Sequence, residues 1–464
     1  MRPGPFPALL GLYDGTPPWA QAVLLTALVV IVGCNAWVVI LFVRSRIALH
    51  EQPDPYDACP DDLLWVAIVP ALDEEVTIVD SVGRLMELDA PNRVVLVVDD
   101  GSTDRTPELL AELGRSTVGG SLSVLRRDPP DARRGKAAAL NAAWHHIHDV
   151  VLRTGPYAGW DPDRVIVTIV DADGRLDADS PRHVAAHFAD PRVGGVQSLV
   201  RIYNRHHVLT WCQDVEFGIY GELYQLGRTR WGTAGMGGNG QFNRLSALDS
   251  VATDARGPWR DKLTEDQDIG LRLIEAGWLG RQEVRTSVHQ QGLPGLRKLY
   301  RQRTRWSQGN LQAMRQLPRV ARAPVPLGAR ADLVAYLLNP VWQAIVGLSL
   351  VTGAWLFAFD DVPFWTSAMP WWLLLLTYSL GFTGAVLGTV ARLARRTPWA
   401  WLVGLLIAQP YALYSWLLFP VLVRATLRLA LRRDSWAKTA REPVAAPHVG
   451  GATTGDEALS RGGR

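Results

Sequence analysis

Acidic side chains stand close together at several points in the middle of this 464-residue chain. Asp171 and Asp173 are separated by one residue, so both carboxylates can present oxygen atoms to a single divalent cation. Oxygen ligands of this kind suit Mg²⁺ or Mn²⁺, and an ion held there would also bind a diphosphate and neutralise charge on a departing one. The pattern therefore predicts a Mg²⁺ or Mn²⁺ site at these two residues.

Asp171 comes directly after an apolar run, residues 165–170. Two other acidic clusters also follow an apolar run. Residues 94–98 are followed by Asp99-Asp100-Gly101-Ser102, and residues 64–69 are followed by a segment that contains Asp73. Each cluster alone is equally well explained as a turn or a helix cap, because Asp and Ser are common in both. Three such clusters in one region favour a shared binding site.

Thr264-Glu265-Asp266 and Lys136 are further candidates for chemistry. An acid in the first segment can take a proton from an attacking hydroxyl, an effect worth ~10²–10⁴-fold in rate. The structural alternative is a helix that begins at Thr264 with acids in its first turn. Lys136 can contact a diphosphate or can begin a solvated helix. Taken alone, the first pattern favours the helix start, whereas the two explanations of Lys136 are equally good.

The region between residues 63 and 290 alternates short apolar runs with helical stretches. The expected strands cover residues 64–69, 94–98, 122–125, 165–170 and 193–199, and the expected helices cover residues 75–87, 107–113, 136–151, 181–188 and 268–276. This alternation is typical of a mainly parallel, Rossmann-like sheet with helices on both faces. Ligands of such α/β sheets bind at the carboxyl ends of the strands, where the acidic clusters stand.

Long apolar runs near both ends of the chain predict membrane helices. Residues 20–43 carry no charged side chain and are long enough to cross a hydrocarbon core of ~30 Å. Arg44 and Arg46 follow, which places the N-terminus outside and the next residues in the cytosol. Further runs cover residues 333–359, 370–391 and 399–423.

The side of the membrane on which the C-terminus lies is ambiguous. Four simple spans would leave it outside, whereas the bases from Arg424 to Lys438 favour the cytosol. Pro410 interrupts the last run, which is then a hairpin or a re-entrant element. We expect a cytosolic tail on this ground.

These patterns divide the chain into parts of different character. We expect a short extracytoplasmic N-terminus (1–19), a membrane helix (20–43), a cytosolic α/β domain (44–293), interfacial amphipathic helices (294–330), a C-terminal membrane region of about three spans (331–430) and a largely disordered tail (431–464). The α/β domain is therefore inserted between membrane helices. The Arg and Ala bias is typical of a GC-rich bacterial genome, so we expect a multi-pass protein of the bacterial cytoplasmic membrane.

The composition excludes or disfavours other classes of function. The formal net charge is only +3, without the concentrated basic face of a nucleic-acid-binding protein. A transporter is disfavoured because the expected spans carry no interior acid or base. Residues 297–317 form a basic helix that suits an interface with anionic membrane lipids. Trp306 within it can stack on a sugar ring or anchor the helix in the membrane.

Four motifs in this order resemble those of the membrane-bound family 2 glycosyltransferases, such as cellulose, hyaluronan, chitin and poly-N-acetylglucosamine synthases. They are Asp99-Asp100-Gly101, Asp171-Ala172-Asp173, Thr264-Glu265-Asp266 and Gln302-Arg303-Thr304-Arg305-Trp306. The resemblance covers residues 63–320. It implies a GT-A fold and an inverting single displacement that forms a β-linkage from a UDP-sugar.

The resemblance also implies roles for individual residues. It places Asp73, Asp99 and Asp100 at the nucleotide, Asp171 and Asp173 at the diphosphate and its metal, and Asp266 as the general base, with Glu265 beside it at the acceptor. It further assigns Lys136, Gln302 and Arg305 to the donor and Trp306 to the acceptor sugar. Where relatives carry a Cys-containing loop near the acceptor, this chain has Gly237–Phe242, in which Asn239 and Gln241 can bond acceptor hydroxyls.

The acceptor itself has two interpretations. The leading one is a growing polysaccharide made by a processive enzyme, with an accessory export subunit as a further expected partner. The second is a lipid that receives one or a few sugars. The size and solubility of the product would separate the two.

Overall fold

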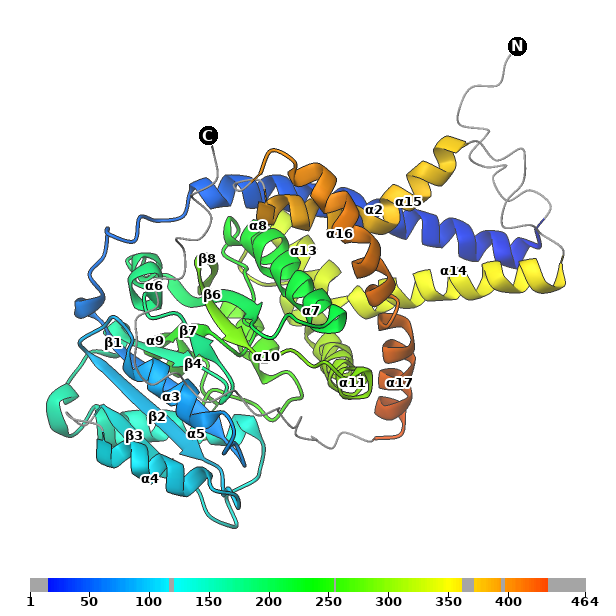
Figure 1. Ribbon diagram of the computed structural model, residues 1–464. Coiled ribbons are helices and arrows are strands. Elements are labelled where there is room, and N and C mark those ends of the chain that lie inside the picture. Colours follow the sequence, from blue (N-terminus) through cyan, green and yellow to red (C-terminus); the bar gives the residue numbers. More distant parts are fainter. Residues whose placement is uncertain (1–15, 117–120, 254–255, 361–370, 394–396, 433–464) are drawn as a thin grey trace, which may run out of the picture.

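The computed structural model describes residues 16–116, 121–253, 256–360, 371–393 and 397–432, with the backbone alone for residues 371–381. The predicted N-terminal segment 1–19 and tail 431–464 therefore lie largely outside the described residues. All five expected strands and the expected helices of the central region are present. The middle of the chain forms an α/β domain, and long helices extend from one side of it (Figure 1).

The sheet has eight strands in the order β3-β2-β1-β4-β7-β6-β8-β5. The strands are β1 Leu64–Ala71, β2 Arg93–Asp99, β3 Leu122–Arg126, β4 Val165–Ile169, β5 Arg175–Leu176, β6 Val193–Ile202, β7 Gln241–Arg244 and β8 Leu279–Gln290. The first four strands in this order, β3, β2, β1 and β4, are parallel to one another, as predicted. However, β7 is antiparallel to both β4 and β6, so the sheet is mixed rather than mainly parallel throughout.

Helices cover both faces of the sheet, because side chains alternate along each buried strand. One face packs on α3 Ile78–Met86, α4 Thr106–Ser116 and α6 Ser180–Phe188, and includes Trp65 and Val97. The other packs on α5 Lys136–His146, α9 Leu245–Ser250 and α10 Glu265–Glu275, and includes Val66 and Leu96. This two-sided burial confirms the layered α/β architecture.

Further helices connect the sheet to the apolar part of the chain. They are α7 Val208–Ile219, α8 Leu226–Thr229, α11 Leu296–Ala313, α12 Leu317–Val320 and α13 Leu327–Leu337. The apolar helices are α2 Pro18–His50, α14 Asn339–Phe359, α15 Trp371–Leu393, α16 Ala400–Ser415 and α17 Leu418–Ala430. Among the described residues, three stretches are long and apolar enough to cross a membrane: 18–50, 339–359 and 400–430.

Two of the expected spans are broken in the structure. The run 333–359 divides into α13 and α14 at Leu338, just before Pro340, which cannot continue a preceding helix without loss of a hydrogen bond. The run 399–423 divides at residues 416–417 between α16 and α17, whereas Pro410 lies inside α16. In Figure 1, α17 runs across the direction in which α2 and α14 extend.

The last helix returns to the α/β domain, because α17 packs along α11. The Tyr300 hydroxyl donates to the carbonyl of Pro420 at 3.0 Å, and Arg428 Nε donates to Gln308 Oε1 at 3.1 Å. The guanidinium of Arg424 lies 4.9 Å from the ring centre of Tyr300. Arg424 and Arg428 therefore lie beside the α/β domain, and the cytosolic location of the tail stays a prediction.

Candidate active site

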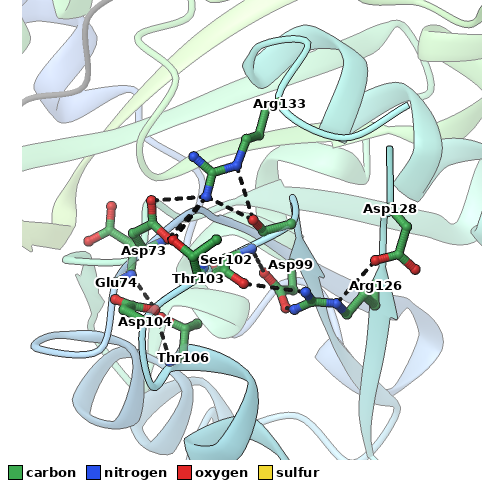
Figure 2. Close-up of polar contacts among 11 residues, drawn as sticks. Asp73, Glu74, Asp99, Ser102, Thr103, Asp104, Thr106, Arg126, Asp128 and Arg133 are labelled. Atoms are coloured by element: carbon green, nitrogen blue, oxygen red, sulfur yellow. Dashed lines mark hydrogen bonds and ion pairs between the residues drawn. The ribbon is translucent and has the colours of Figure 1, made fainter. Parts of the chain in front are cut away.

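The loops after β1 and β2 are fastened to each other by their acidic residues (Figure 2). Asp73 adopts a positive φ of 53°, and its carboxylate accepts hydrogen bonds from the backbone N–H of Thr103 at 2.7 Å and from Arg133 at 3.3 Å. In return, the backbone N–H of Asp73 donates to the Ser102 hydroxyl at 2.9 Å. Asp73 thus fixes the edge of the predicted nucleotide site and does not line the cavity described below.

Asp99 and Asp100 are neighbours in sequence, but they face different surroundings. The Asp99 carboxylate is 1% exposed, accepts from the Ser102 N–H at 2.9 Å and is paired with Arg126. Asp100 lines the cavity and pairs with Arg127 at 2.6 Å, and burial raises the pKa of its carboxyl. The predicted donor role of Asp99 therefore has no support in the geometry: its oxygens already hold the loop.

A cavity of about 520 Å³ opens where the strands β1, β2 and β4 end. Most of the predicted site residues line it, although they come from distant parts of the sequence: Asp100, Lys136, Asp171, Asp173, Asn239, Glu265, Asp266, Gln302, Arg305 and Trp306. Asp73, Asp99 and Gln241 do not line it. Gln241 is fully buried behind the cavity, where its amide donates to Asn243 Oδ1 at 2.6 Å.

Lys136 joins two of the predicted motifs. Its Nζ lies 2.6 Å from Asp171 Oδ1 and 3.6 Å from Glu265 Oε1. Burial alone lowers the pKa of Lys136, but the two carboxylates outweigh it and raise that pKa above its usual value. Lys136 stands at the first residue of α5, behind Gly135, whose φ of 94° favours glycine. The side chain is therefore a fixed cation inside the cavity.

Glu265 and Asp266 occupy the first turn of α10. Burial raises the pKa of both carboxyls, that of Glu265 to about 7, and the charges of Lys136 and Arg305 offset part of the effect. The backbone N–H of Gln267 donates to Asp266 Oδ1 at 2.8 Å, which holds that carboxylate in place. A buried carboxylate with a raised pKa is a stronger base than an exposed one, as proton abstraction requires.

Asp171 and Asp173 are suited to a divalent cation. Both line the cavity, and Asp171 is supported by Asn239, whose Oδ1 accepts its backbone N–H at 3.1 Å. Asp173 accepts the backbone N–H of Gln291 at 3.1 Å. Within the described ranges, no three His, Cys, Asp or Glu side chains gather around one point. An ion held by these two carboxylates would take its remaining ligands from a diphosphate and water.

Sequence reasoning missed a buried cluster behind Trp306. Arg303 is 4% exposed, and its guanidinium lies 4.1 Å from the ring centre of Trp306. Its Nη2 lies 2.5 Å from Glu216 Oε2, which also accepts from the Tyr414 hydroxyl at 2.7 Å. In the sequence, Arg303 stands inside the Gln302–Trp306 motif, but the motif gives it no role. Glu216 and Tyr414 carried no sequence signal.

The cavity continues past Trp306 to the helices that lead into the apolar part of the chain. Its walls there include Asn339 and Gln343 of α14 and Leu418 and Val421 of α17. The site thus joins a charged end at the sheet to an end with apolar side chains. Such a cavity suits a polar donor at one end and an amphiphilic acceptor at the other.

Comparison with known proteins identifies the family. Residues 166–431 match the family described as "Glycosyl transferase family group 2", and residues 66–251 match "Glycosyl transferase family 2". The first match covers more than half of the chain. The chain belongs to the family 2 glycosyltransferases. The site described above lies within these two matched regions.

Individual relatives of this glycosyltransferase differ in their acceptors. The beta-monoglucosyldiacylglycerol synthase of Synechocystis sp. is 29% identical over 386 residues, which are 80% of this chain and 74% of that protein. The poly-beta-1,6-N-acetyl-D-glucosamine synthase of Staphylococcus aureus is 26% identical over 273 residues, which are 58% of this chain and 59% of that protein. The chain therefore spans less than two thirds of the second relative.

A solved structure shares the fold. Mannosyltransferase PcManGT from Pyrobaculum calidifontis, in complex with GDP-Man and Mn²⁺, aligns with a TM-score of 0.59 at 20% identity and covers 89% of this chain and 99% of that one. The similarity confirms the GT-A-like fold that the family resemblance predicted.

Proposed function

We propose that this glycosyltransferase moves a hexose or N-acetylhexosamine from a UDP-sugar to a hydroxyl of an acceptor held at the cytoplasmic membrane. The observation that carries the proposal is the single cavity that the acidic motifs of the sheet share with α11, α14 and α17. The α/β domain then lies on the cytosolic side, where nucleotide sugars are available.

In this proposal the donor binds at the carboxyl ends of β1, β2 and β4. Asp100 is placed to contact the nucleoside, and Lys136, Gln302 and Arg305 are placed around the diphosphate. Asp171 and Asp173 would hold Mg²⁺ or Mn²⁺, which would neutralise charge on the leaving diphosphate. Lys136 Nζ lies 2.6 Å from Asp171 Oδ1, so its ammonium stands beside the carboxylate that this proposal assigns to the diphosphate and its metal.

Transfer is a single displacement in which Asp266 accepts the proton of the acceptor hydroxyl. The acceptor oxygen forms a bond to the anomeric carbon of the donor while the bond from that carbon to the diphosphate oxygen breaks. The electron pair leaves with UDP. Attack opposite the leaving group converts an α-linked sugar nucleotide into a β-linked product.

The preferred acceptor in this proposal is a lipid with a free hydroxyl. Leu418 and Val421 give the far end of the cavity an apolar wall, and the relative with the greater coverage is a diacylglycerol glycosyltransferase by name. A growing polysaccharide is the second candidate, because Trp306 lines the cavity and an indole face suits a sugar ring. Asn239 and Glu265 stand near the acceptor hydroxyl in either case.

Product analysis tests the proposal. Purified protein in lipid vesicles receives radiolabelled UDP-glucose, UDP-N-acetylglucosamine or GDP-mannose, with and without diacylglycerol, and the Asp266→Asn variant serves as the inactive control. We expect label from a UDP-sugar in an organic-soluble product that depends on diacylglycerol. Label in a long, organic-insoluble product identifies the polysaccharide acceptor instead. Absence of transfer from every donor contradicts the proposal.

A further inference from the structure

A second cavity, of about 280 Å³, lies directly behind the catalytic segment. Thr264, the residue before Glu265, lines it from one side, and Gly309 of α11 lines it from the other. Four basic residues surround it: Arg260 and Lys262 from the segment before α10, and Arg315 and Arg319 from the segment after α11. We refer to these four residues as the basic cluster.

The basic cluster has an unbalanced positive charge. Among the described residues, no ion pair within 4.0 Å joins any of its four members to an acid. Asp268 lines the same cavity, but its Oδ2 is bound by Arg272 at 2.8 Å and its Oδ1 by Gln316 at 2.9 Å. Like charges that share a cavity repel one another, and a bound anion removes that repulsion.

Two further acids lie near the cluster and do not neutralise it. Asp261 lies between Arg260 and Lys262 and is exposed, as are Lys262, Arg315 and Arg319 themselves. Glu275 is half-buried on α10 and interacts electrostatically with Arg319, with Arg272 and with Arg260. Among the residues that the structure describes, the cluster and Arg272 are five cations against three acids, so the charge around the cavity is net positive.

The position of the cluster points to the membrane as the source of the anion. Arg315 and Arg319 stand between α11, which packs against α17, and the segment α13–α14, which enters the apolar part of the chain. In Figure 1, α17 crosses the direction of α2 and α14, as a helix in the plane of the membrane surface does. Leu296 and Leu327, at the first residues of α11 and α13, are 58% and 78% exposed, which suits contact with lipid.

An anion in this cavity would affect the catalytic segment. The contact between Thr264 and α11 is close: a Cβ at Gly309 would lie 2.4 Å from Thr264 Cγ2. An anion that bridges Arg260 or Lys262 to Arg315 or Arg319 would hold this contact closed. Glu265 and Asp266 would then keep their position relative to Gln302 and Trp306, which lie on the same helix as Gly309.

We infer that the basic cluster binds the phosphate headgroup of an anionic membrane lipid and that this binding stabilises the active arrangement of α10 and α11. A phosphodiester accepts several charge-assisted hydrogen bonds from arginine, so the site prefers a phosphate anion to a neutral group. The inference concerns a cavity separate from the active site and does not depend on which sugar or acceptor the enzyme uses.

Lipid binding is measured first, because it needs no activity. Native mass spectrometry compares the retention of phosphatidylglycerol and phosphatidylcholine on the wild type, on Arg315→Gln/Arg319→Gln and on Arg260→Gln/Lys262→Gln. Arg115→Gln/Arg164→Gln is the matched control, because it removes two exposed charges of the α/β domain outside the cavity. We expect both cluster variants to bind phosphatidylglycerol about 30-fold more weakly than the wild type, while the control binds normally. Equal loss in the control, or equal retention of both lipids by the wild type, refutes the site.

The catalytic consequence is measured in vesicles. We expect transfer to be several-fold faster in vesicles of phosphatidylcholine with about 30% phosphatidylglycerol than in pure phosphatidylcholine, and the cluster variants to lose only this stimulation. Inorganic phosphate is added to pure phosphatidylcholine vesicles in a separate arm. If phosphate alone reproduces the stimulation, the ligand is a soluble anion and the membrane source is wrong. If lipid binds without any stimulation, the proposed effect on α10 and α11 is wrong.

Discussion

At the scale of single residues, the site depends on how buried charges are compensated. Lys136 lies between Asp171 and Glu265, and the acids that follow β1 and β2 are divided between ligand-facing and loop-holding positions. Asp100 faces the cavity, whereas Asp99 is occupied by Arg126. Whether a carboxylate can bind a ligand therefore depends on the side chains that it already contacts, and not on its residue type alone.

The Asp266→Asn variant tests the proposed general base. An amide cannot accept the proton, so we expect transfer to fall by about 10²–10⁴-fold while the Kd for UDP stays near that of the wild type. Turnover and calorimetric UDP binding measure the two effects. A variant with near-normal turnover would remove Asp266 from the role of base.

The pH profile of the wild type gives a second measurement at the same residue. Burial raises the pKa of Asp266, and only the deprotonated form can accept a proton. We therefore expect kcat to fall as the pH drops through this raised pKa, at a higher pH than for an exposed aspartate. A profile that stays flat down to the ordinary range of aspartate contradicts this expectation.

At the scale of secondary-structure elements, α11 is the part that brings the site together. It carries Gln302, Arg305 and Trp306 on the cavity side, contacts Thr264 through Gly309 and packs along α17. Predictions at this scale concern how α11 is held, because a small displacement of the helix moves three cavity residues at once.

Gly309→Ala tests the contact between α11 and the start of α10. The added Cβ would lie 2.4 Å from Thr264 Cγ2 and 2.6 Å from Oγ1, so one element must shift. We expect transfer to fall by about tenfold or more, as misplacement of catalytic groups by a fraction of an ångström does. Gly295→Ala, where a Cβ meets nothing within 4 Å, is the control in the same segment and should retain activity. Equal rates for the two variants would contradict the prediction.

Tyr414→Phe tests the cluster that holds Arg303 behind Trp306. The variant loses the hydroxyl that donates to Glu216, a bond worth about 1 kcal/mol, so we expect a rise of about fivefold in the acceptor KM and little change in donor hydrolysis. In the Trp306→Ala background the same change should have no further effect, because Tyr414 acts through the indole. Tyr411→Phe, one turn earlier in α16, is the control. An equal rise in the acceptor KM in the wild-type and Trp306→Ala backgrounds indicates a merely structural role for Tyr414.

At the scale of the whole molecule, a buried ion pair connects the first apolar helix to the rest. Arg228 of α8 lies 2.6 Å from Asp332 of α13, and the indole of Trp37 in α2 donates to the same carboxylate at 2.7 Å. Both charged side chains are almost fully buried. Three elements that are distant in sequence thus meet at one carboxylate.

Asp332→Asn is expected to loosen this connection. Removing the charge leaves Arg228 buried without its partner, so we expect a loss of about 3 kcal/mol in unfolding free energy. Thermal unfolding in detergent micelles measures it. Glu51→Gln, which breaks the exposed pair with Arg230, is the control and should cost less than about 1 kcal/mol. A loss no larger than that of the control would mean that the buried pair contributes little.

The sequence by itself determined the α/β alternation, the family and the convergence of the acidic motifs. Buried strands and amphipathic helices leave periodic patterns, and parallel strands place their carboxyl ends at one edge, so Asp100 and Asp171 had to lie close together. The signature that contains Gln302 and Trp306 gave the rest of the cavity by resemblance. These features depend on local spacing, which a sequence records directly.

Only the tertiary structure decided which candidate side chains face the cavity. Asp99 and Gln241 are held away from the cavity: Asp99 pairs with Arg126 of β3, and Gln241 donates to Asn243, two residues further along β7. Arg303 is held behind Trp306 by Glu216, which also accepts from Tyr414; no sequence motif links these two residues to Arg303. A polar side chain takes the partners that the fold brings within about 3 Å, and those partners are fixed by packing between distant segments.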